Sequence, residues 1–155
     1  MLIRRHERAV FALASASLGG PARRADVEDC AQEAFLAAYR ALGSLREPAA
    51  FGAWLLGIAR LQARKALKRR GRHPVQSLPE GLPFPQPLAS GAEEALQALS
   101  RLPDPEREAV ALRHLAGRSP SQIAASLDLP EGTVRSRISR GLARLRGKLG
   151  KGVPC

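Results

Sequence analysis

Hydrophobic positions recur at helical spacing along most of this chain. In the last third, one arc of about 80°, at about 100° per residue, holds the apolar residues Val134, Ile138, Leu142, Leu145 and Leu149. The strict alternation that marks half-buried strands is missing, and so are internal repeats. Since alanine and leucine dominate and aromatic residues make up only 4%, the pattern predicts an all-α fold.

A tight turn separates two of the predicted helices near residue 129. Ser119 can accept from a free backbone N–H, Pro120 suits the first helical position, and Gln122 completes a capping box. Pro130 ends this helix, and Glu131 opens the next one, where the positive end of the helix dipole favours a carboxylate. Two short helices joined in this way are typical of a DNA-reading helix-turn-helix.

Opposite its apolar arc, the second of these helices presents arginine and serine. Arginine can grip two acceptors of guanine, serine can bond several base edges, and the first turns of such a helix reach the bases. We therefore predict base contacts for Arg135, Ser136, Ser139 and Arg140. Contacts to phosphate, which position without specifying, are predicted for Thr133, Arg137 and Arg144. The alternative is a solvated basic face on an ordinary bundle, but the caps, the turn and the arginines agree with one another.

Charge supports a nucleic-acid partner. The chain has 25 Lys and Arg against 14 Asp and Glu, a net charge of +11. Residues 60–72 and 132–155 each carry seven basic side chains and no acidic one, so each segment can follow a phosphate backbone. A membrane surface is the competing target. No stretch approaches the ~20 apolar residues of a spanning helix, and no leader-like segment opens the chain, so we expect no membrane insertion.

The cysteines and histidines do not suggest catalysis. Cys30 and Cys155 make neither a disulfide framework nor a zinc site. Cys30 lies on a predicted helix as a small, partly buried apolar residue, and the three scattered histidines offer a catalytic thiol no partner. A nuclease-like enzyme would need clustered carboxylates beside the basic face, and a structural RNA-binding protein would not need the capped helix-turn-helix. We predict a cytoplasmic, non-enzymatic protein without cofactors or metals.

Proline divides the chain. Five of the twelve prolines fall between residues 74 and 87, which predicts an extended linker over residues 71–91. Two small helical domains are expected on either side, over residues 1–70 and 92–149, with a flexible tail over 150–155. In the second domain, a helix over 93–102 precedes one that Asp104 caps, with Pro105 at its first position.

The first domain is predicted to hold three helices: residues 3–18, a second from Asp26, and a third from about Pro48. The buried stripe of the second helix is expected to be Val27, Ala31, Ala34, Phe35, Ala38 and Leu42. Its other face presents Asp29, Gln32, Glu33, Leu36 and Arg40. An exposed leucine in an acidic face fits a protein-docking site, or equally a solvated face with one stray apolar residue.

The third predicted helix starts apolar and continues basic. Phe51 and Trp54 open it, and Arg60, Arg64 and Lys68 follow at spacings of four as one basic stripe. Aromatic residues at this spacing are most often core residues. The alternative is an aromatic side chain that supports unpaired bases beside a basic track.

These segments together resemble a known family. The run from Asp26 to Tyr39 resembles the second conserved region of bacterial sigma-70-type factors of the extracytoplasmic-function (ECF) group, and the run from Phe51 to Arg60 resembles its continuation. Residues 102–149 resemble the fourth region. The resemblance implies a sigma factor that binds core RNA polymerase and directs it to promoters. The alternative, a stand-alone helix-turn-helix regulator, leaves the acidic helix and the proline-rich spacer without a role.

The resemblance also implies the sites. The polymerase-docking face would be Asp26, Asp29, Gln32, Glu33 and Leu36, and the fourth region would bind the −35 element of double-stranded promoter DNA. The residues that would engage the −10 element and its melted strand are Trp54, Arg60, Leu61, Arg64, Lys65 and Lys68. Leu61 and Lys65 stand where the family usually has Asn and Asp, so −10 base reading is expected to differ. An anti-sigma factor is a family expectation without a signature in the chain.

Overall fold

A computed structural model describes residues 2–19, 24–71 and 97–149 of the chain. Its regular elements are α1 (Leu2–Leu18), α2 (Arg24–Ala41), two single 3₁₀ turns (Leu42–Ser44 and Pro48–Ala50), α3 (Phe51–Arg70), α5 (Asp104–His114), α6 (Pro120–Leu127) and α7 (Glu131–Leu149). Residues 97–100 are also helical, and the described residues contain no strand, which confirms the all-α prediction. The predicted linker beyond residue 71, the start of the helix over 93–102 and the tail lie outside the described residues.

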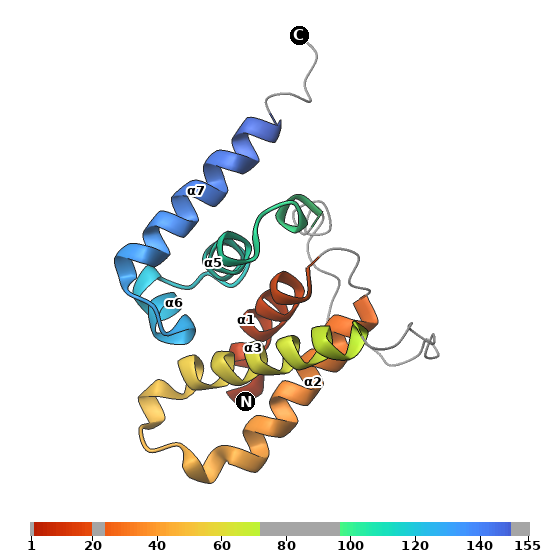
Figure 1. Cartoon of the computed structure of the whole chain (residues 1–155). Helices are drawn as coiled ribbons and strands as arrows, with labels where there is room; N and C mark the ends of the chain where they lie inside the picture. Colours follow the sequence, from red (N-terminus) through yellow and green to blue (C-terminus); the bar gives the residue numbers. More distant parts are fainter. Residues whose placement is uncertain (1, 20–23, 72–96, 150–155) are drawn as a thin grey trace.

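Helices α1, α2 and α3 form the first half of the molecule (Figure 1). Val10 and Leu13 of α1 and Leu55 of α3 are fully buried among them. The facing side of α2 offers alanines, including Ala34 and Ala38, and small side chains allow close helix packing. Burying one leucine side chain contributes about 1.5–3 kcal/mol relative to exposing it, so this core is the main source of stability of the first half.

Helices α5, α6 and α7 form the second half, in which α7 lies against both other helices. Val134 of α7 and Ile123 of α6 are fully buried. Gly141 lies where α7 crosses α5, and a Cβ atom there would come within 2.7 Å of Val110 Cγ2. Glycine at this position therefore allows α7 to approach α5 closely.

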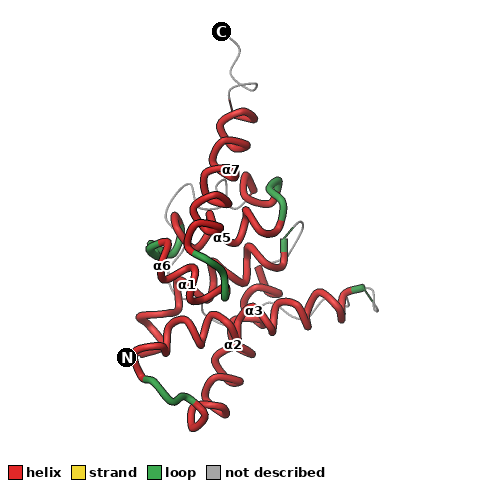
Figure 2. The backbone as a smooth tube through the Cα atoms, turned by 60° about the vertical axis from the view of Figure 1, so that its left-hand side comes forward, coloured by secondary structure: helices red, strands yellow, loops and turns green. Residues whose placement is uncertain are grey.

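The two halves pack on each other as one body. Helix α1 contacts α5, and α3 contacts α6. A single apolar cluster runs through both halves and joins Leu55 and Leu56 of α3 to Leu112, Ile123 and Leu127 of the second half. The turned view of Figure 2 shows the two halves side by side, with α7 reaching beyond the other helices.

Two local predictions were wrong. Asp104 does not cap α5: Pro103 occupies the N-cap position, and Asp104 is the first helical residue, its carboxylate paired with the guanidinium of Arg107. Leu42 does not continue the buried stripe of α2. The helix ends at Ala41, and the following 3₁₀ turn leaves the Leu42 side chain 46% exposed.

Candidate nucleic-acid interface

The outer face of α7 gathers the four residues predicted to contact bases. Arg135, Ser136, Ser139 and Arg140 are all exposed, and together they line one shallow depression on the surface. Val134 is fully buried on the opposite side of the same helix, so the apolar arc fixes which side chains face outward. An exposed row of arginine and serine on the first turns of a helix matches the donors and acceptors of base edges.

Local hydrogen bonds and one left-handed residue form the turn before α7. The Gln122 N–H donates to Ser119 Oγ at 3.2 Å, and the Ser119 N–H donates to Gln122 Oε1 at 3.0 Å, which confirms the predicted capping box. Asp128 ends α6 in the left-handed region, with φ of 53°. That conformation reverses the chain within a few residues and lets α7 start at Glu131.

Two acidic residues pair with arginines of α7, and the sequence analysis predicted neither of these ion pairs. Glu131 Oε1 accepts from Arg135 Nε at 3.0 Å and from Nη2 at 2.6 Å, within one turn of the helix. Glu106, a buried residue of α5, lies 2.9 Å from Arg144 Nε. The spacing of four between Glu131 and Arg135 was the available sequence signal, whereas the pair with Arg144 depends on the packing of α5. Thr133 and Arg137 are half-buried at the inner margin of the face.

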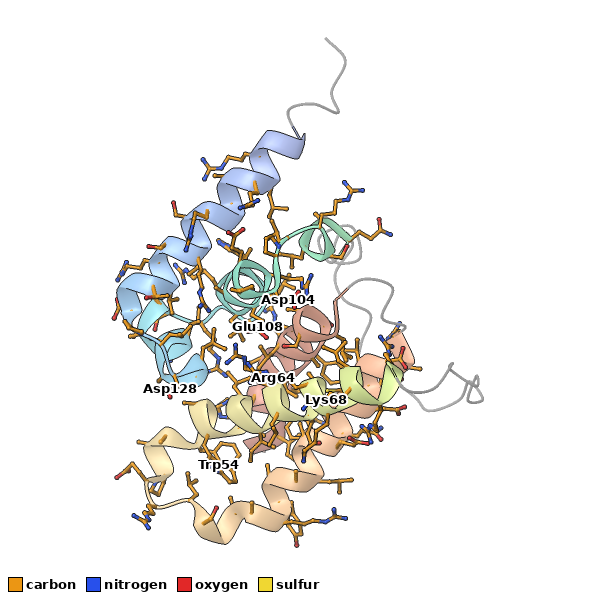
Figure 3. The ribbon with its side chains drawn as sticks, viewed as in Figure 1. Trp54, Arg64, Lys68, Asp104, Glu108 and Asp128 are labelled. Carbon is orange, nitrogen blue, oxygen red and sulfur yellow. The ribbon has the colours of Figure 1, made fainter. Side chains whose placement is uncertain are left out.

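The predicted basic stripe of α3 is only partly a surface feature. Arg64, Lys65 and Lys68 are exposed, and Figure 3 shows Arg64 and Lys68 along this helix. Arg60 does not belong to the exposed stripe. Its side chain is 24% exposed because its guanidinium pairs with the buried carboxylate of Glu108 on α5, with Nη2 at 3.0 Å from Oε2. The prediction that Arg60 lies on the exposed stripe was therefore wrong. No local sequence pattern could have indicated a partner 48 positions away.

An apolar groove lies between α3 and α6. On the α3 side it is lined by residues that include Trp54, Ile58 and Leu61, and on the α6 side by Ala125, Ser126 and Asp128. Trp54 is half-buried, and its ring lies 5.9 Å from that of Phe51. Trp54 thus packs against the core with one side and lines the groove with the other. It combines features of both sequence interpretations, the core residue and the aromatic side chain beside a basic track.

The acidic face of α2 is partly occupied by basic residues of α3. Asp26 pairs with Arg70, and Glu33 with Arg69 at 3.0 Å. Asp29 and Gln32 are exposed, and the Leu36 side chain is 54% exposed. Sequence reasoning missed Tyr39, which is 80% exposed one turn beyond Leu36 and extends the apolar part of this face.

Cys30 has the environment of a structural thiol. It is 2% exposed, and burial, reinforced by the charge of Glu33 and opposed by Arg69, raises its pKa to about 11. A thiol with such a pKa is a poor nucleophile at neutral pH. Among the described residues, no group of three His, Cys, Asp or Glu side chains could hold a metal ion. Nor does this part of the chain contain a helix long and apolar enough to cross a membrane.

Family comparisons agree with this geometry. Residues 2–73 match sigma-70 region 2, and residues 92–145 match sigma-70 region 4. Helices α1–α3 thus fall in the first match and α5 and α6 in the second, with most of α7. The chain belongs to the sigma-70 family of RNA polymerase sigma factors.

Within that family, the chain is similar to members of the ECF group, as the sequence predicted. The ECF RNA polymerase sigma-E factor of Escherichia coli (strain K12) is 39% identical over 141 residues, which cover 80% of this chain and 74% of that protein. The probable RNA polymerase sigma factor RfaY of Xanthomonas campestris pv. campestris is 37% identical over 134 residues, or 79% of this chain and 34% of that protein. The function is that of a sigma factor, and the stand-alone regulator is not favoured.

Solved structures share the arrangement of helices. CnrH, solved in complex with the cytosolic domain of CnrY, has a TM-score of 0.70 and 28% identity, with 98% of this chain and 87% of that chain covered. The sigma factor RpoE, solved in complex with the anti-sigma factor NepR from Bartonella quintana, has a TM-score of 0.72 and 24% identity, with 98% and 96% covered. This second likeness concerns the fold alone.

Proposed function

We propose that this sigma factor selects promoters by reading the −35 element with the outer face of α7 and by engaging the −10 element with α3. The observation that carries the proposal is the exposed row of Arg135, Ser136, Ser139 and Arg140 above an apolar arc packed inward. Arg137 and Thr133 lie where phosphate contacts would fix the register of the helix in the groove. The role is binding and positioning, without catalysis by this chain.

The exposed basic side chains of α3 support the −10 assignment. Arg64, Lys65 and Lys68 present a row of charge that suits a strand backbone. Leu61 is 51% exposed beside Trp54 in the groove, and its aliphatic side chain has no donor or acceptor for a base edge. We therefore assign to α3 backbone and stacking contacts rather than hydrogen-bonded reading at position 61.

The outer face of α2 is the surface proposed to dock on core RNA polymerase. Leu36 and Tyr39 provide exposed apolar area, and Asp29 and Gln32 surround it with polar groups. An apolar centre with a polar rim is the usual anatomy of a protein interface. With α2 fixed on polymerase, α3 and α7 act as two modest DNA sites on one tether, which raises their effective concentration for each other.

An anti-sigma factor is proposed as a second protein partner, and the cytoplasm as the compartment where both act. Support comes from two solved structures with the same arrangement of helices: CnrH in complex with the cytosolic domain of CnrY, and the sigma factor RpoE in complex with the anti-sigma factor NepR from Bartonella quintana. A partner that covers the DNA-binding surfaces would hold the chain inactive until it is released.

The test is transcription in vitro with core RNA polymerase, with and without this chain, on a library of genomic promoter fragments. We expect discrete transcripts that depend on the chain and share a −35 sequence. If the chain adds no specific transcript from any fragment, the proposed promoter selection is wrong.

A further inference from the structure

The two arginines that border the depression on α7 are held in the same way. Each is bonded through its Nε to the residue four positions earlier in the helix. Arg140 Nε donates to the Ser136 carbonyl oxygen at 3.3 Å. Arg135 donates from Nε at 3.0 Å and from Nη2 at 2.6 Å, both to Glu131 Oε1. The preceding turn of the helix therefore orients both arginines.

Helix stability gives only a partial reason for Glu131. Its carboxylate suits the positive end of the helix dipole, but that effect does not need Arg135. The side chains of the pair are 43% and 65% exposed, and an exposed ion pair contributes little to stability because water screens it. Glu131 also brings a negative charge close to a face that must approach the phosphates of DNA. The contact with Arg135 therefore has to be judged by what it does for binding.

The guanidinium of Arg135 keeps enough donors for a base. A guanidinium has five N–H groups, one on Nε and two on each terminal nitrogen. Glu131 takes the N–H of Nε and one of those on Nη2, which leaves both groups of Nη1 and one of Nη2. Guanine presents two acceptors in the major groove, O6 and N7, and an arginine binds them with two donors. The ion pair thus fixes the guanidinium by its side and leaves its end available for guanine.

The same ion pair makes Arg135 a poor contact for phosphate. The Glu131 carboxylate offsets much of the positive charge of the guanidinium, and it would repel the oxygens of a nearby phosphate. The edge of guanine carries acceptors without a full negative charge, so this repulsion affects it less. Glu131 therefore favours a base over the DNA backbone as the partner of Arg135.

We propose that Glu131 is a positioning residue for base recognition, which orients the Arg135 guanidinium toward a guanine and disfavours its contact with phosphate. This inference rests on the proposed reading of the −35 element by the outer face of α7. A side chain that is held in place before binding loses less conformational entropy when it meets its ligand. Removal of the carboxylate should therefore weaken the preference for one base at one position of the element.

The experiment measures base preference with holoenzyme assembled from core RNA polymerase and the full-length chain. The probe is a promoter fragment from the transcription test with its −35 element randomised, and bound and unbound fragments are sequenced. Discrimination at each position is the ratio of binding with the preferred base to binding with the next-preferred one. Arg135→Ala identifies the position that Arg135 reads, where discrimination should fall at least about fivefold, the lower range for a bidentate contact.

Three further variants separate positioning from charge. Glu131→Ala removes the acceptor and the charge, whereas Glu131→Gln removes the charge but keeps an oxygen that can accept from Arg135. Asp128→Asn is the matched control, since it removes a negative charge three positions before Glu131. Asparagine, like aspartate, tolerates the left-handed backbone of this residue, with φ of 53°. All three variants change the net charge of the chain equally.

We expect Glu131→Ala to lower discrimination about twofold at the Arg135 position and at no other, which matches a typical ion pair four residues apart on a helix. Glu131→Gln should retain more of this discrimination, and Asp128→Asn all of it. In the Arg135→Ala background, Glu131→Ala should have no further effect. Unchanged discrimination in Glu131→Ala, or an equal loss in Glu131→Gln or Asp128→Asn, would overturn the positioning role.

A structural effect and a failure of the proposed function are both distinguishable from this outcome. A weaker start of α7 would lower binding to all fragments and leave the ratios between bases unchanged, and circular dichroism checks the folding of each variant. If Arg135→Ala alters no position, Arg135 reads no base, and its proposed function falls together with the inference. If Arg135→Ala lowers discrimination at one position but Glu131→Ala does not, the inference alone is wrong.

Discussion

Arg140 and Arg146 are both exposed on α7, but they differ in their distance from the start of the helix. Arg140 lies beside Ser136 and Ser139, and its Nε donates to the Ser136 carbonyl at 3.3 Å, which keeps the side chain along the outer face. Arg146 lies nearly two turns further on, beyond the turns that reach bases in a recognition helix. Comparing these two arginines therefore separates the effect of a base contact from the general effect of a positive charge.

Arg140→Ala should weaken binding to a −35 duplex by roughly 1–3 kcal/mol and relax specificity at one base pair, because a bidentate contact to a base is lost. Binding is measured against a set of duplexes with single-base changes across the −35 element. The matched variant Arg146→Ala should lower affinity slightly and equally on all of them. An equal loss on every duplex for Arg140→Ala would show that this arginine contacts only phosphate.

Gly19 is constrained in two ways. Its φ of +53° lies in the left-handed region, and a Cβ atom would come within 2.5 Å of Arg107 Nη2. Arg107 cannot easily yield, since it also donates to the carbonyls of Ala16 and Leu102. Gly19→Ala should lower the free energy of unfolding by about 1–3 kcal/mol, measured by urea denaturation.

The control for this change is Gly57→Ala on α3, where no atom lies within 4 Å of the added Cβ. A helical glycine costs roughly 0.5–1 kcal/mol relative to alanine, so this variant should be more stable than the wild type. If Gly19→Ala were equally stabilising, neither the backbone conformation nor Arg107 would constrain the position.

At the scale of the elements, the sequence predicts best what depends on neighbours along the chain. The capping box of Ser119 and Gln122 and the apolar arc of α7 use spacings of three and four, and both occur in the structure. Asp104 was assigned to a cap because Pro105 follows it, but α5 begins one residue earlier, with Pro103 at the N-cap position. Arg60 was placed on an exposed stripe because the carboxylate that holds it comes from another half of the molecule. Arg60 was thus misplaced because its partner arrives through packing, whereas the errors at Asp104 and Leu42 are shifts of one residue at the end of a helix.

The apolar part of the α2 face gives a prediction at this scale. Leu36→Asp should greatly reduce capture of core RNA polymerase by the full-length chain, because a charge would replace the exposed apolar centre of the proposed interface. Capture is measured by pull-down with purified core polymerase, and folding by circular dichroism. Ile3→Asp on α1 is the matched control, since Ile3 is 56% exposed and Leu36 54%. Undiminished capture by a folded Leu36→Asp variant would remove α2 from the docking surface.

At the scale of the whole molecule, the two halves interlock through opposite charges and shared apolar surface. The contacts of Glu108 with Arg60 and of Arg107 with Ala16 hold α5 against the first half. Near the start of α6, Arg118 Nη2 lies 2.9 Å from His6 Nδ1 of α1. These polar contacts can be replaced by water or by ligands when the halves separate, whereas the apolar cluster must be uncovered. The equilibrium between packed and separated halves should therefore respond to conditions that change single polar contacts.

His6 makes that equilibrium dependent on pH. It is 8% exposed, and its ring lies 5.3 Å from Phe51. Burial, followed by the charges of Arg118 and Arg5, lowers its pKa below the ordinary value of 6.5. Arg5 faces it from its own helix and Arg118 from the segment before α6, while Phe51 and Gly52 of α3 add no charge. The neutral ring can accept from Arg118, but a protonated ring would place a second positive charge against the guanidinium.

Separated halves therefore bind a proton at His6 more readily than packed halves do. The contribution of this contact to packing is complete above about pH 6.5 and is lost as the pH falls through the lowered pKa of His6. We expect Trp54 emission to shift to longer wavelength between pH 7.5 and pH 5, measured at constant ionic strength. His6→Gln keeps an acceptor for Arg118 without titrating, so its emission should stay constant over that range. An identical shift in both proteins would assign the pH response to another group, and a wild-type emission that does not change would show that the His6 contact does not control how the halves pack.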